Sequence, residues 1–210
     1  MIRLLIADDH AILRSGLRQL FSIAGDIVVA AEAEDAPQVI DALRDTEVDV
    51  ALLDLSMPGT SGVDLVARLS DRYPRLAIVV LSMHNEPQIA ERALKAGAAG
   101  YVTKDSDAAT LLAAVRTAAA GKRFIAPKIA QKLVLRAMEG GPELPHERLS
   151  DRELAVMQLL VRGETVADIA ATLAISAKTV STHKTRLLQK MGLRNGTELL
   201  RYAIEHKLIE

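Results

Sequence analysis

The first 120 residues alternate between short apolar runs and segments with helical periodicity, and this alternation limits the fold more than any other feature. Five apolar runs, IRLLIA, IVVAAE, VDVALLD, LAIVVLS and AGYVT, have the length of strands. Helix-periodic segments follow them, beginning near Ala11, Ala36, Gly62, Glu86 and Asp107. Strands that alternate with helices form parallel sheets covered by helices. We therefore predict an α/β, doubly wound fold for this half.

Polar side chains stand at the carboxyl ends of four of these runs. Asp8 and Asp9 follow the first run, Asp54 ends the third, Ser82 ends the fourth and Lys104 follows the fifth. In an open parallel sheet, these strand ends face the ligand crevice. Taken alone, each residue has an ordinary structural explanation as a helix cap, a turn residue or a solvated charge. Their coincidence at four strand ends predicts one shared site.

Three carboxylates in one site repel one another, and a bound divalent cation removes this repulsion. Oxygen ligands without cysteine or histidine favour Mg²⁺ or Mn²⁺ over Zn²⁺. With such an ion in place, one carboxylate can act as a nucleophile, because the ion and Lys104 neutralise the charge of an incoming phosphoryl group. Asp54 stands where its strand emerges, just before Pro58 and Gly59 turn the chain, so it is either a chemical group or a carboxylate solvated by the loop.

Charge is divided unevenly along the chain. Residues 1–120 hold 11 basic and 17 acidic residues, 121–147 hold 5 and 3, and 148–210 hold 10 and 7, which together give the net charge of −1. A basic final part favours a nucleic-acid partner. The absence of cysteine excludes disulfides and thiolate-metal sites. Neither a signal-peptide pattern nor an apolar run of membrane-spanning length is present, so we expect a cytoplasmic protein.

The segment 121–147 is predicted to connect two folded parts. The stretch PKIAQKLVLRAME is amphipathic and predicts a short linker helix. The stretch GGPELPHE, residues 140–147, contains two glycines and two prolines without periodicity and predicts a flexible linker. The residues after this linker carry helical patterns throughout.

Residues 148–210 carry the start signals of four helices. The first helix is LAVMQLLVRG, which follows the capping box SDRE that begins at Ser150. The second is TVADIAATLA. Ser176 and Asn195 are suitable N-caps of a third and a fourth helix. A tight turn before a basic third helix is the helix-turn-helix pattern. We expect its inward side to hold Val180, Leu187, Leu188 and Met191, and its outward side to hold Lys178, Ser181, Thr182, Lys184, Thr185 and Arg186. A merely solvated helix face would explain the same charges.

Residues 1–120 resemble the receiver domain of two-component response regulators. The segments LLIADDH, LLDLSMPGTSG, VVLS and GAAGYVTKD match its motifs in order and spacing. The resemblance implies a flavodoxin-like (βα)5 fold in which Asp54 accepts a phosphoryl group from a sensor kinase's phosphohistidine. It further implies that Asp9 and Asp54 bind Mg²⁺ directly, Asp8 binds it through water, and Ser56 binds it through its backbone carbonyl. Ser82 and Lys104 would bind the phosphoryl group. Tyr101 would be a switch aromatic that turns inward as Ser82 moves. An ordinary strand aromatic is the alternative for Tyr101.

Residues 148–210 resemble a LuxR-type helix-turn-helix domain, and the whole chain is similar to NarL/FixJ-type transcription regulators. The resemblance makes 178–190 the recognition helix and 197–207 the helix through which two copies pair on half-sites. It implies base contacts by Ser181, Thr182 and Thr185 and phosphate contacts by Lys178, Lys184 and Arg186. His183 either contacts DNA or packs at the helix boundary. Glu153 is expected to be a buried structural partner.

These features predict a phosphorylation-switched, sequence-specific transcription regulator of a two-component system, and no enzyme beyond its own phosphoryl transfer. The expected domains are a receiver over 1–120, a linker over 121–147 and a DNA-binding domain over 148–210. Expected partners are promoter DNA, a sensor histidine kinase and, after phosphorylation, a second copy of the chain, with RNA polymerase as a further partner and no membrane.

Two other functional classes compete with this interpretation. One is a haloacid-dehalogenase-like phosphatase with an aspartyl-phosphate intermediate, which would need a D-x-D motif. Asp54-Leu55-Ser56 lacks the second carboxylate. The other is an interaction module whose receiver never carries phosphate, and the intact set of acids with Lys104 argues against it.

Overall fold

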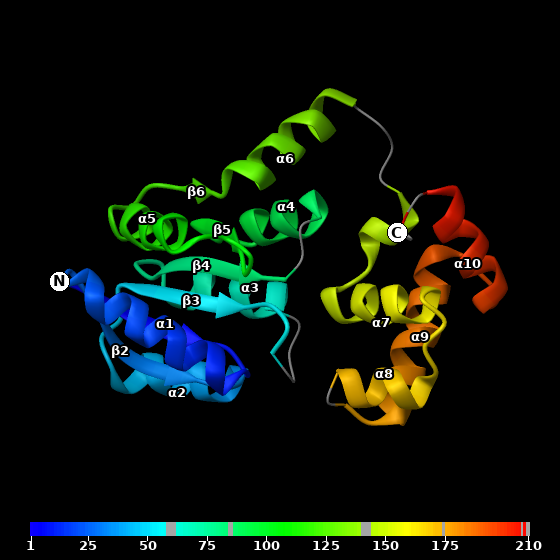
Figure 1. Ribbon diagram of the computed structural model, residues 1–210, viewed down its shortest axis with the longest axis horizontal. Helices are drawn as coiled ribbons and strands as arrows, with labels where there is room; N and C mark the ends of the chain where they lie inside the picture. The colour runs from blue at the N-terminus through cyan, green and yellow to red at the C-terminus, as the bar shows by residue number, and fades with distance from the viewer. Residues whose placement is uncertain (58–61, 84–85, 140–143, 174, 207, 209–210) are drawn as a thin grey trace. The chain divides into compact units, whose positions relative to one another are not determined.

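The structure is a computed structural model that describes the chain except for residues 58–61, 84–85, 140–143, 174, 207 and 209–210 (Figure 1). The chain forms two compact units, Met1–Gly140 and Gly141–Glu210. Each unit has buried apolar residues of its own. Within the described residues, no helix has the length and apolar character needed to cross a membrane.

The first unit is built on a parallel sheet with the strand order β2-β1-β3-β4-β5-β6. The strands are β1 (Ile2–Ala7), β2 (Ile27–Ala33), β3 (Val50–Asp54), β4 (Ala77–Ser82), β5 (Gly100–Thr103) and β6 (Phe124–Ile125). Strand order reverses between β1 and β3, which is the switch point of a flavodoxin-like sheet. The predicted fold class is therefore confirmed.

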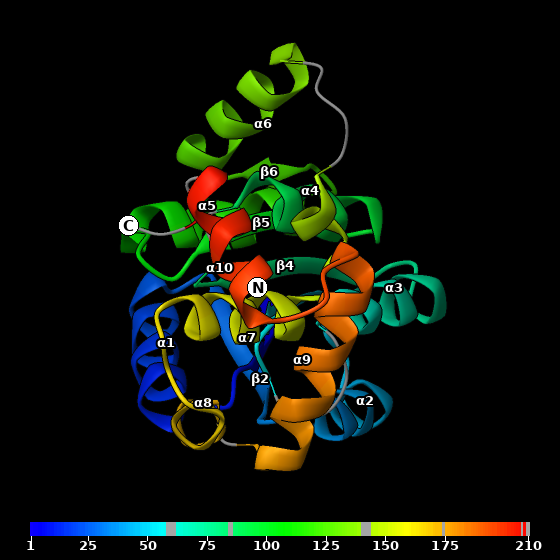
Figure 2. The ribbon, with the colours of Figure 1, turned by 90° about the vertical axis from the view of Figure 1, so that its right-hand side faces the viewer.

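Helices cover both faces of this sheet (Figure 2). They are α1 (Ala11–Ala24), α2 (Ala36–Asp45), α3 (Gly62–Arg72), α4 (Pro87–Lys95) and α5 (Ala108–Ala119), while α6 (Pro127–Glu139) follows β6 and packs against α4. α1 and α5 lie on one face, and α2, α3 and α4 lie on the other. Phe21 of α1 and Val115 of α5 share a core cluster with Leu52 of β3. Because both faces are covered, β3 is buried at every position.

β6 and α6 extend the first unit beyond the five predicted strands. β6 pairs with the outer edge of β5, and the N–H of Ala126 donates to the carbonyl of Tyr101 at 3.0 Å. α6 is the helix predicted within 121–147, and it buries Ile129 completely. A strand of two residues has no measurable periodicity, which is why the sequence did not predict β6. The first four residues of the predicted flexible linker, 140–147, lie outside the described residues.

The second unit contains the four predicted helices after a short 3₁₀ turn. Its elements are η1 (Pro145–Arg148), α7 (Asp151–Val161), α8 (Val166–Thr172), α9 (Ala177–Met191) and α10 (Gly196–Glu205). The predicted N-caps Ser150, Ser176 and Asn195 each accept a hydrogen bond from the backbone N–H three residues later. Helices α7, α9 and α10 therefore begin directly after their predicted N-caps.

The core of the second unit lies mainly between α7, α8, α9 and α10. Its buried residues include Met157, Ile169, Val180, Leu187, Met191, Leu199 and Ala203. Leu188, expected in the core, is only partly buried. η1 belongs to this core, because His146 is buried and its Nδ1 lies 2.8 Å from the Tyr202 hydroxyl of α10.

Candidate functional site

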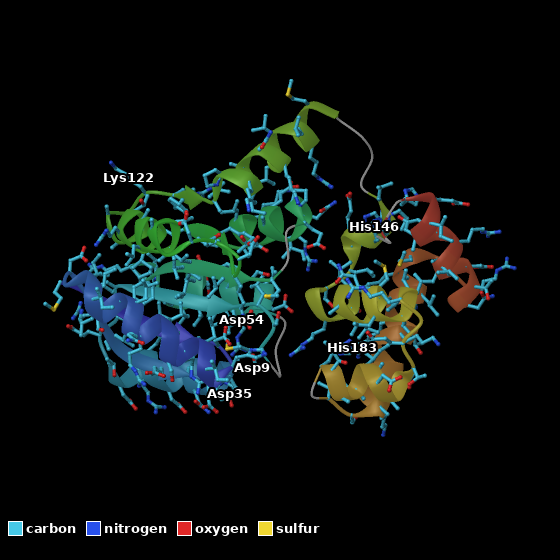
Figure 3. All side chains as sticks on the ribbon, in the orientation of Figure 1. Asp9, Asp35, Asp54, Lys122, His146 and His183 are labelled. Carbon is cyan, nitrogen blue, oxygen red and sulfur yellow. The ribbon has the colours of Figure 1, made fainter. Side chains whose placement is uncertain are left out.

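The carboxyl ends of β1, β3 and β5 bring acidic and basic side chains together. Asp8 and Asp9 follow β1, Asp54 ends β3 and Lys104 follows β5. One ligand atom from each of Asp8, Asp9, His10 and Asp54 lies within 4.8 Å of the others. Figure 3 labels Asp9 and Asp54 at this end of the sheet. Three carboxylates and an imidazole at this spacing form a donor set that suits a divalent cation.

Lys104 connects two of these acids. Its Nζ lies 2.7 Å from Asp8 Oδ2 and 2.9 Å from Asp54 Oδ2. The Lys104 side chain is only 8% exposed, and both carboxylates are more deeply buried. One ammonium group therefore holds the ends of three strands together.

Charge in this cluster is unbalanced, because two buried carboxylates share one ammonium group. Burial is the main cause that raises the pKa of Asp54; Lys104 opposes it, while Asp8 raises the pKa further. Burial by itself would lower the pKa of Lys104, but Asp54 and Asp8 outweigh it, so this pKa is raised. The raised pKa of Lys104 reflects the two carboxylates beside it, and the raised pKa of Asp54 reflects mainly the burial of its charge, which a bound cation would offset.

The Asp54 carboxylate is fixed at both oxygens. Oδ2 accepts a hydrogen bond from Lys104 Nζ, and Oδ1 accepts one from the backbone N–H of Ser56 at 3.0 Å. Its Cα belongs to the fully buried strand β3. The carboxylate therefore has little freedom to rotate before it reacts or binds a cation.

Ser82 and Tyr101 lie on neighbouring strands beside this cluster. Ser82 ends β4 and Tyr101 is the second residue of β5, and both are completely buried. The backbone N–H of Lys104 donates to the carbonyl of Ser82 at 2.8 Å. A shift of the β4 end would therefore be felt directly by the residue that carries the cluster's ammonium group.

His10 belongs to this cluster, although only oxygen ligands were expected from the sequence. Its Nδ1 lies 2.9 Å from Asp9 Oδ1 and 3.1 Å from Asp8 Oδ1. Its backbone N–H also donates to Asp8 Oδ1 at 2.8 Å. The available signal was its position directly after the acidic pair in ADDH.

Arg14 supports the acidic pair from behind and was likewise not predicted. It is 8% exposed, and its Nη1 donates to the backbone carbonyl of Asp8 at 2.6 Å. Its Nη2 donates to Glu34, beyond β2. A signal existed in the sequence: Arg14 lies three and seven residues before the buried Leu17 and Phe21, on the inward side of α1.

In the second unit, α9 presents the polar side that the sequence predicted. Lys178, Ser181, Thr182, Thr185 and Arg186 are exposed, while Lys184 is half-buried. The three hydroxyl groups donate to the carbonyls four residues earlier, each at 3.0 Å. This back-bonding fixes the hydroxyl hydrogen and leaves oxygen lone pairs and threonine methyl groups for a ligand.

The other side of α9 is anchored by an ion pair. Lys190 Nζ lies 2.6 Å from Glu153 Oε2, and Glu153 is 3% exposed. Glu153 Oε2 also accepts a hydrogen bond from the Ser150 N–H at 2.8 Å, which closes the predicted capping box of α7. Glu153 is thus the buried structural partner that is expected from the sequence.

His183 faces the protein more than the solvent. It is half-buried, and its Nδ1 is buried without a hydrogen-bond partner among the described residues. Figure 3 labels its position in the second unit. Burial lowers the pKa of His183, against the attraction of Glu153. The neutral ring therefore favours packing over a phosphate contact.

Two family models match the chain and together cover most of it. The response regulator receiver domain matches residues 4–116, and the luxR family of bacterial regulatory proteins matches residues 147–203. The two matches fall in the two compact units of the structure, one in each.

Similar proteins extend over the whole chain. The response regulator UvrY of Escherichia coli K12 is 34% identical over 209 residues, covering 99% of this chain and 96% of its own. The response regulator GacA of Pseudomonas viridiflava is 32% identical and covers 100% and 99%. The oxygen regulatory protein NreC of Staphylococcus aureus JH9 is 33% identical and covers both chains completely.

Solved structures of the RcsB response regulator from Salmonella share the architecture. One from Salmonella typhimurium has a TM-score of 0.63, 32% identity, and covers 96% of this chain and 98% of its own. Another, bound to the promoter P1flhDC in the presence of the phosphomimetic BeF₃⁻, has a TM-score of 0.64, 31% identity, and covers 96% and 97%.

This chain belongs to the response regulators. Its second unit places it among those that join a receiver domain to a LuxR-family DNA-binding domain, which are transcription regulators and not typical enzymes.

The Glu153–Lys190 pair yields a prediction about acid stability. The folded-state pKa of Glu153 lies below its ordinary value of 4.5, because Lys190 and the Ser150 groups outweigh the opposing effect of burial. Ionised Glu153 therefore stabilises the second unit above pH 4.5, and this contribution is lost as the pH falls further. We expect Glu153→Gln to lower the free energy of unfolding by about 1–2 kcal/mol at neutral pH and by less in acid.

Scanning calorimetry of the full chain at a series of pH values measures both effects. Glu205→Gln, at an exposed position of α10, is the matched control and should change neither. Equal destabilisation by Glu153→Gln at neutral and acid pH would contradict the assignment.

Proposed function

We propose that Asp54 accepts a phosphoryl group from a sensor histidine kinase, and that this modification controls sequence-specific DNA binding by the second unit. The observation that carries the proposal is the placement of Asp54, a rigidly held carboxylate within 2.9 Å of a buried ammonium group at the sheet's carboxyl edge. The receiver then catalyses its own phosphorylation and no other reaction. We place this activity in the cytoplasm.

The cluster fits a magnesium ion, or manganese in its place, because it has oxygen donors and an excess of negative charge. Asp9 and Asp54 would hold the ion directly, Asp8 through water, and Ser56 through its backbone carbonyl. When bound, the ion would offset negative charge on the phosphoryl group. The side chains of Asp54, Lys104 and Ser82 form the new bond and bind the phosphoryl oxygens.

The transfer itself is a substitution at phosphorus. An oxygen of Asp54 forms the new P–O bond while the P–N bond to the kinase histidine breaks, and the bonding electrons leave with the imidazole nitrogen. Lys104 moves its ion pair from the bare carboxylate to a phosphoryl oxygen. The Ser82 hydroxyl donates a hydrogen bond to another phosphoryl oxygen.

We further propose that Tyr101 is the switch aromatic. Its side chain is already completely buried in the unmodified chain. A Ser82 drawn toward the phosphoryl group would vacate space beside β5, so phosphorylation would favour this inward position of Tyr101 over an outward one. For such a switch to matter, phosphorylation must favour the active state by on the order of a few kcal/mol.

For DNA binding, α9 is proposed as the recognition helix. Ser181, Thr182 and Thr185 are assigned to base edges. Lys178, Lys184 and Arg186 are assigned to phosphates.

A homodimer on paired half-sites would join through α10, where Leu200 and Ile204 are 42% and 62% exposed. The promoter-bound RcsB structure supports a DNA partner for a chain of this architecture. RNA polymerase is proposed as a further partner.

Replacing the acceptor separates this proposal from its alternatives. With acetyl phosphate as the donor and Mg²⁺ present, wild-type protein should acquire one acid-stable mass increment, and Asp54→Asn should acquire none, since an amide is not a nucleophile here. Asp41→Asn, at an exposed surface pair on α2, should behave as wild type.

Intact-protein mass spectrometry gives the answer directly. Label on Asp54→Asn would overturn the acceptor assignment. Hydrolysis of added phosphoesters by wild type would favour the phosphatase alternative, and a wild type that takes no label would favour the interaction module.

A pair of substitutions on α9 tests the sorting of its contacts. Lys178→Ala should weaken binding equally on all sequences and reduce the salt slope of log K by about 0.9 for each copy bound, because one phosphate contact is lost. Thr182→Ala should leave the salt slope unchanged and alter the ratio between operator variants by about fivefold, or about 1 kcal/mol.

Fluorescence anisotropy with labelled duplexes at several salt concentrations measures both quantities. The two variants serve as controls for each other, since both side chains are exposed on the same helix. If Lys178→Ala changed base preference instead, the assignment of phosphate and base contacts would be wrong.

A further inference from the structure

We propose that His10 is a nitrogen ligand of the cation held by Asp8, Asp9 and Asp54, and that it shifts this site toward first-row transition metal ions such as Mn²⁺. The proposal rests on the proposed function in one respect, namely that the acidic cluster holds a divalent cation. It adds a donor of a different chemical kind to a site otherwise made of oxygens.

The His10 ring is already in place for this role. Its Nδ1 lies 2.9 Å from Asp9 Oδ1 and 3.1 Å from Asp8 Oδ1. The hydrogen bond from its own backbone N–H to Asp8 Oδ1 fixes the residue on the cluster. One donor atom from each of the four side chains lies within 4.8 Å of the other three.

These distances match the spacing of ligands around an octahedral ion. Metal–ligand bonds of about 2.1 Å place adjacent ligands about 3.0 Å apart. The Nδ1 atom is therefore close enough to the Asp9 oxygen for both to bind one ion, with Asp8 beside them to bind through water. A hydrogen bond from a ring N–H to the carboxylates would have similar lengths, so the experiment must distinguish coordination from hydrogen bonding.

The chemical consequence is a change in metal preference. Magnesium prefers oxygen ligands and water, whereas imidazole suits transition metals, for which affinity rises along the Irving–Williams order. A nitrogen ligand should therefore strengthen Mn²⁺ binding far more than Mg²⁺ binding.

Calorimetric titration of the full chain with Mn²⁺ and with Mg²⁺ measures this preference. We expect His10→Gln to weaken Mn²⁺ binding about tenfold and Mg²⁺ binding less than about threefold. With one equivalent of Mn²⁺, electron spin-echo spectroscopy should detect ¹⁴N modulation from a directly bound imidazole in wild type. That modulation should be absent in His10→Gln and retained in the control His206→Gln.

The spectroscopic result decides the proposal even if His10→Gln folds poorly. A wild-type Mn²⁺ complex without ¹⁴N modulation would overturn it. Equal weakening of Mn²⁺ and Mg²⁺ would also overturn it, because it would make His10 a positioning residue. A protein that binds neither ion would contradict the proposed cation site itself.

A second inference comes from β6 and does not involve the cation. We infer that β6 transmits movement of the Tyr101 strand to the linker helix α6. The inference rests on the proposed function in that phosphorylation would supply the movement.

Backbone hydrogen bonds tie the linker to the chain on both sides of Gly100, and one of them is to Tyr101 itself. The N–H of Phe124 donates to the carbonyl of Ala99 at 2.9 Å, and that of Ala126 donates to Tyr101 at 3.0 Å. At Gly100, between them, a Cβ would lie 3.0 Å from the carbonyl oxygen of Phe124, so glycine allows this close approach.

The linker helix is attached to the same region. α6 begins one residue after Ala126, and its Ile129 is completely buried. Arg136 lies 3.7 Å from Glu91 of α4. β6 lies along the outer edge of β5. A displacement of β5 therefore reaches β6 through the hydrogen bonds of Phe124 and Ala126, and it reaches α6 through Ala126, the one residue between β6 and α6.

Ala126→Pro removes the N–H donor that bonds Tyr101, whereas Ala126→Gly keeps it and is the control. Both variants should be labelled by acetyl phosphate to the wild-type level. Phosphorylation should change DNA affinity in wild type and in Ala126→Gly, and this change should fall to less than about twofold in Ala126→Pro.

Amide exchange in the wild-type chain provides a second measurement that needs no variant. Beryllofluoride, as a phosphoryl mimic, should alter the exchange rates of the Phe124 and Ala126 N–H groups. Unchanged rates, or a wild-type response in Ala126→Pro, would overturn the inference. A wild type whose DNA affinity ignores phosphorylation would instead contradict the proposed function.

Discussion

The receiver site depends on one ammonium group shared between two carboxylates. Lys104 reaches Asp8 and Asp54 within 3 Å and so joins the ends of β5, β1 and β3. Sharing leaves two carboxylates with one ammonium group in a buried place, and burial is the main reason why the pKa of Asp54 is raised. A bound cation would lower the free-energy cost of this buried negative charge. This is the physical reason to expect metal-dependent chemistry at the carboxyl ends of these strands.

Support for this cluster comes from groups that are not themselves reactive. Arg14 holds the carbonyl of Asp8 from the buried side, and the Ser56 N–H orients Asp54. The backbone bond between Lys104 and Ser82 ties β5 to the end of β4. β6 pairs with the free side of β5. The strand that carries Tyr101 is therefore hydrogen-bonded to β4 on one side and to β6, at the start of the linker, on the other.

The second unit separates its structural and its binding groups onto two sides of one helix. Glu153 and Lys190 fix α9 against α7. The hydroxyl groups of its exposed side bond within the helix, which limits their rotation before any ligand arrives. An α9 that is pre-ordered in this way loses less side-chain entropy when it binds.

Several features could be predicted from the sequence because their causes are local. Runs of apolar residues placed the five main strands, and capping residues such as Ser176 placed the starts of helices. The topology of a parallel sheet then made Asp8, Asp54 and Lys104 neighbours, because strand ends meet at one edge whatever the loops between them.

Other features were decided only by tertiary contacts. His10 and Arg14 took part in the cluster through the direction of α1, and β6 formed because β5 offered an unpaired edge and Gly100 left room for it. His183 looked equally suited to DNA and to packing until burial of its Nδ1 favoured packing. The sequence by itself determined which residues stand at each strand end and helix start, since these depend on short-range periodicity and capping. The tertiary structure alone decided which of them share a proton donor, a cation site or a strand edge, since those depend on distances between segments far apart in the chain.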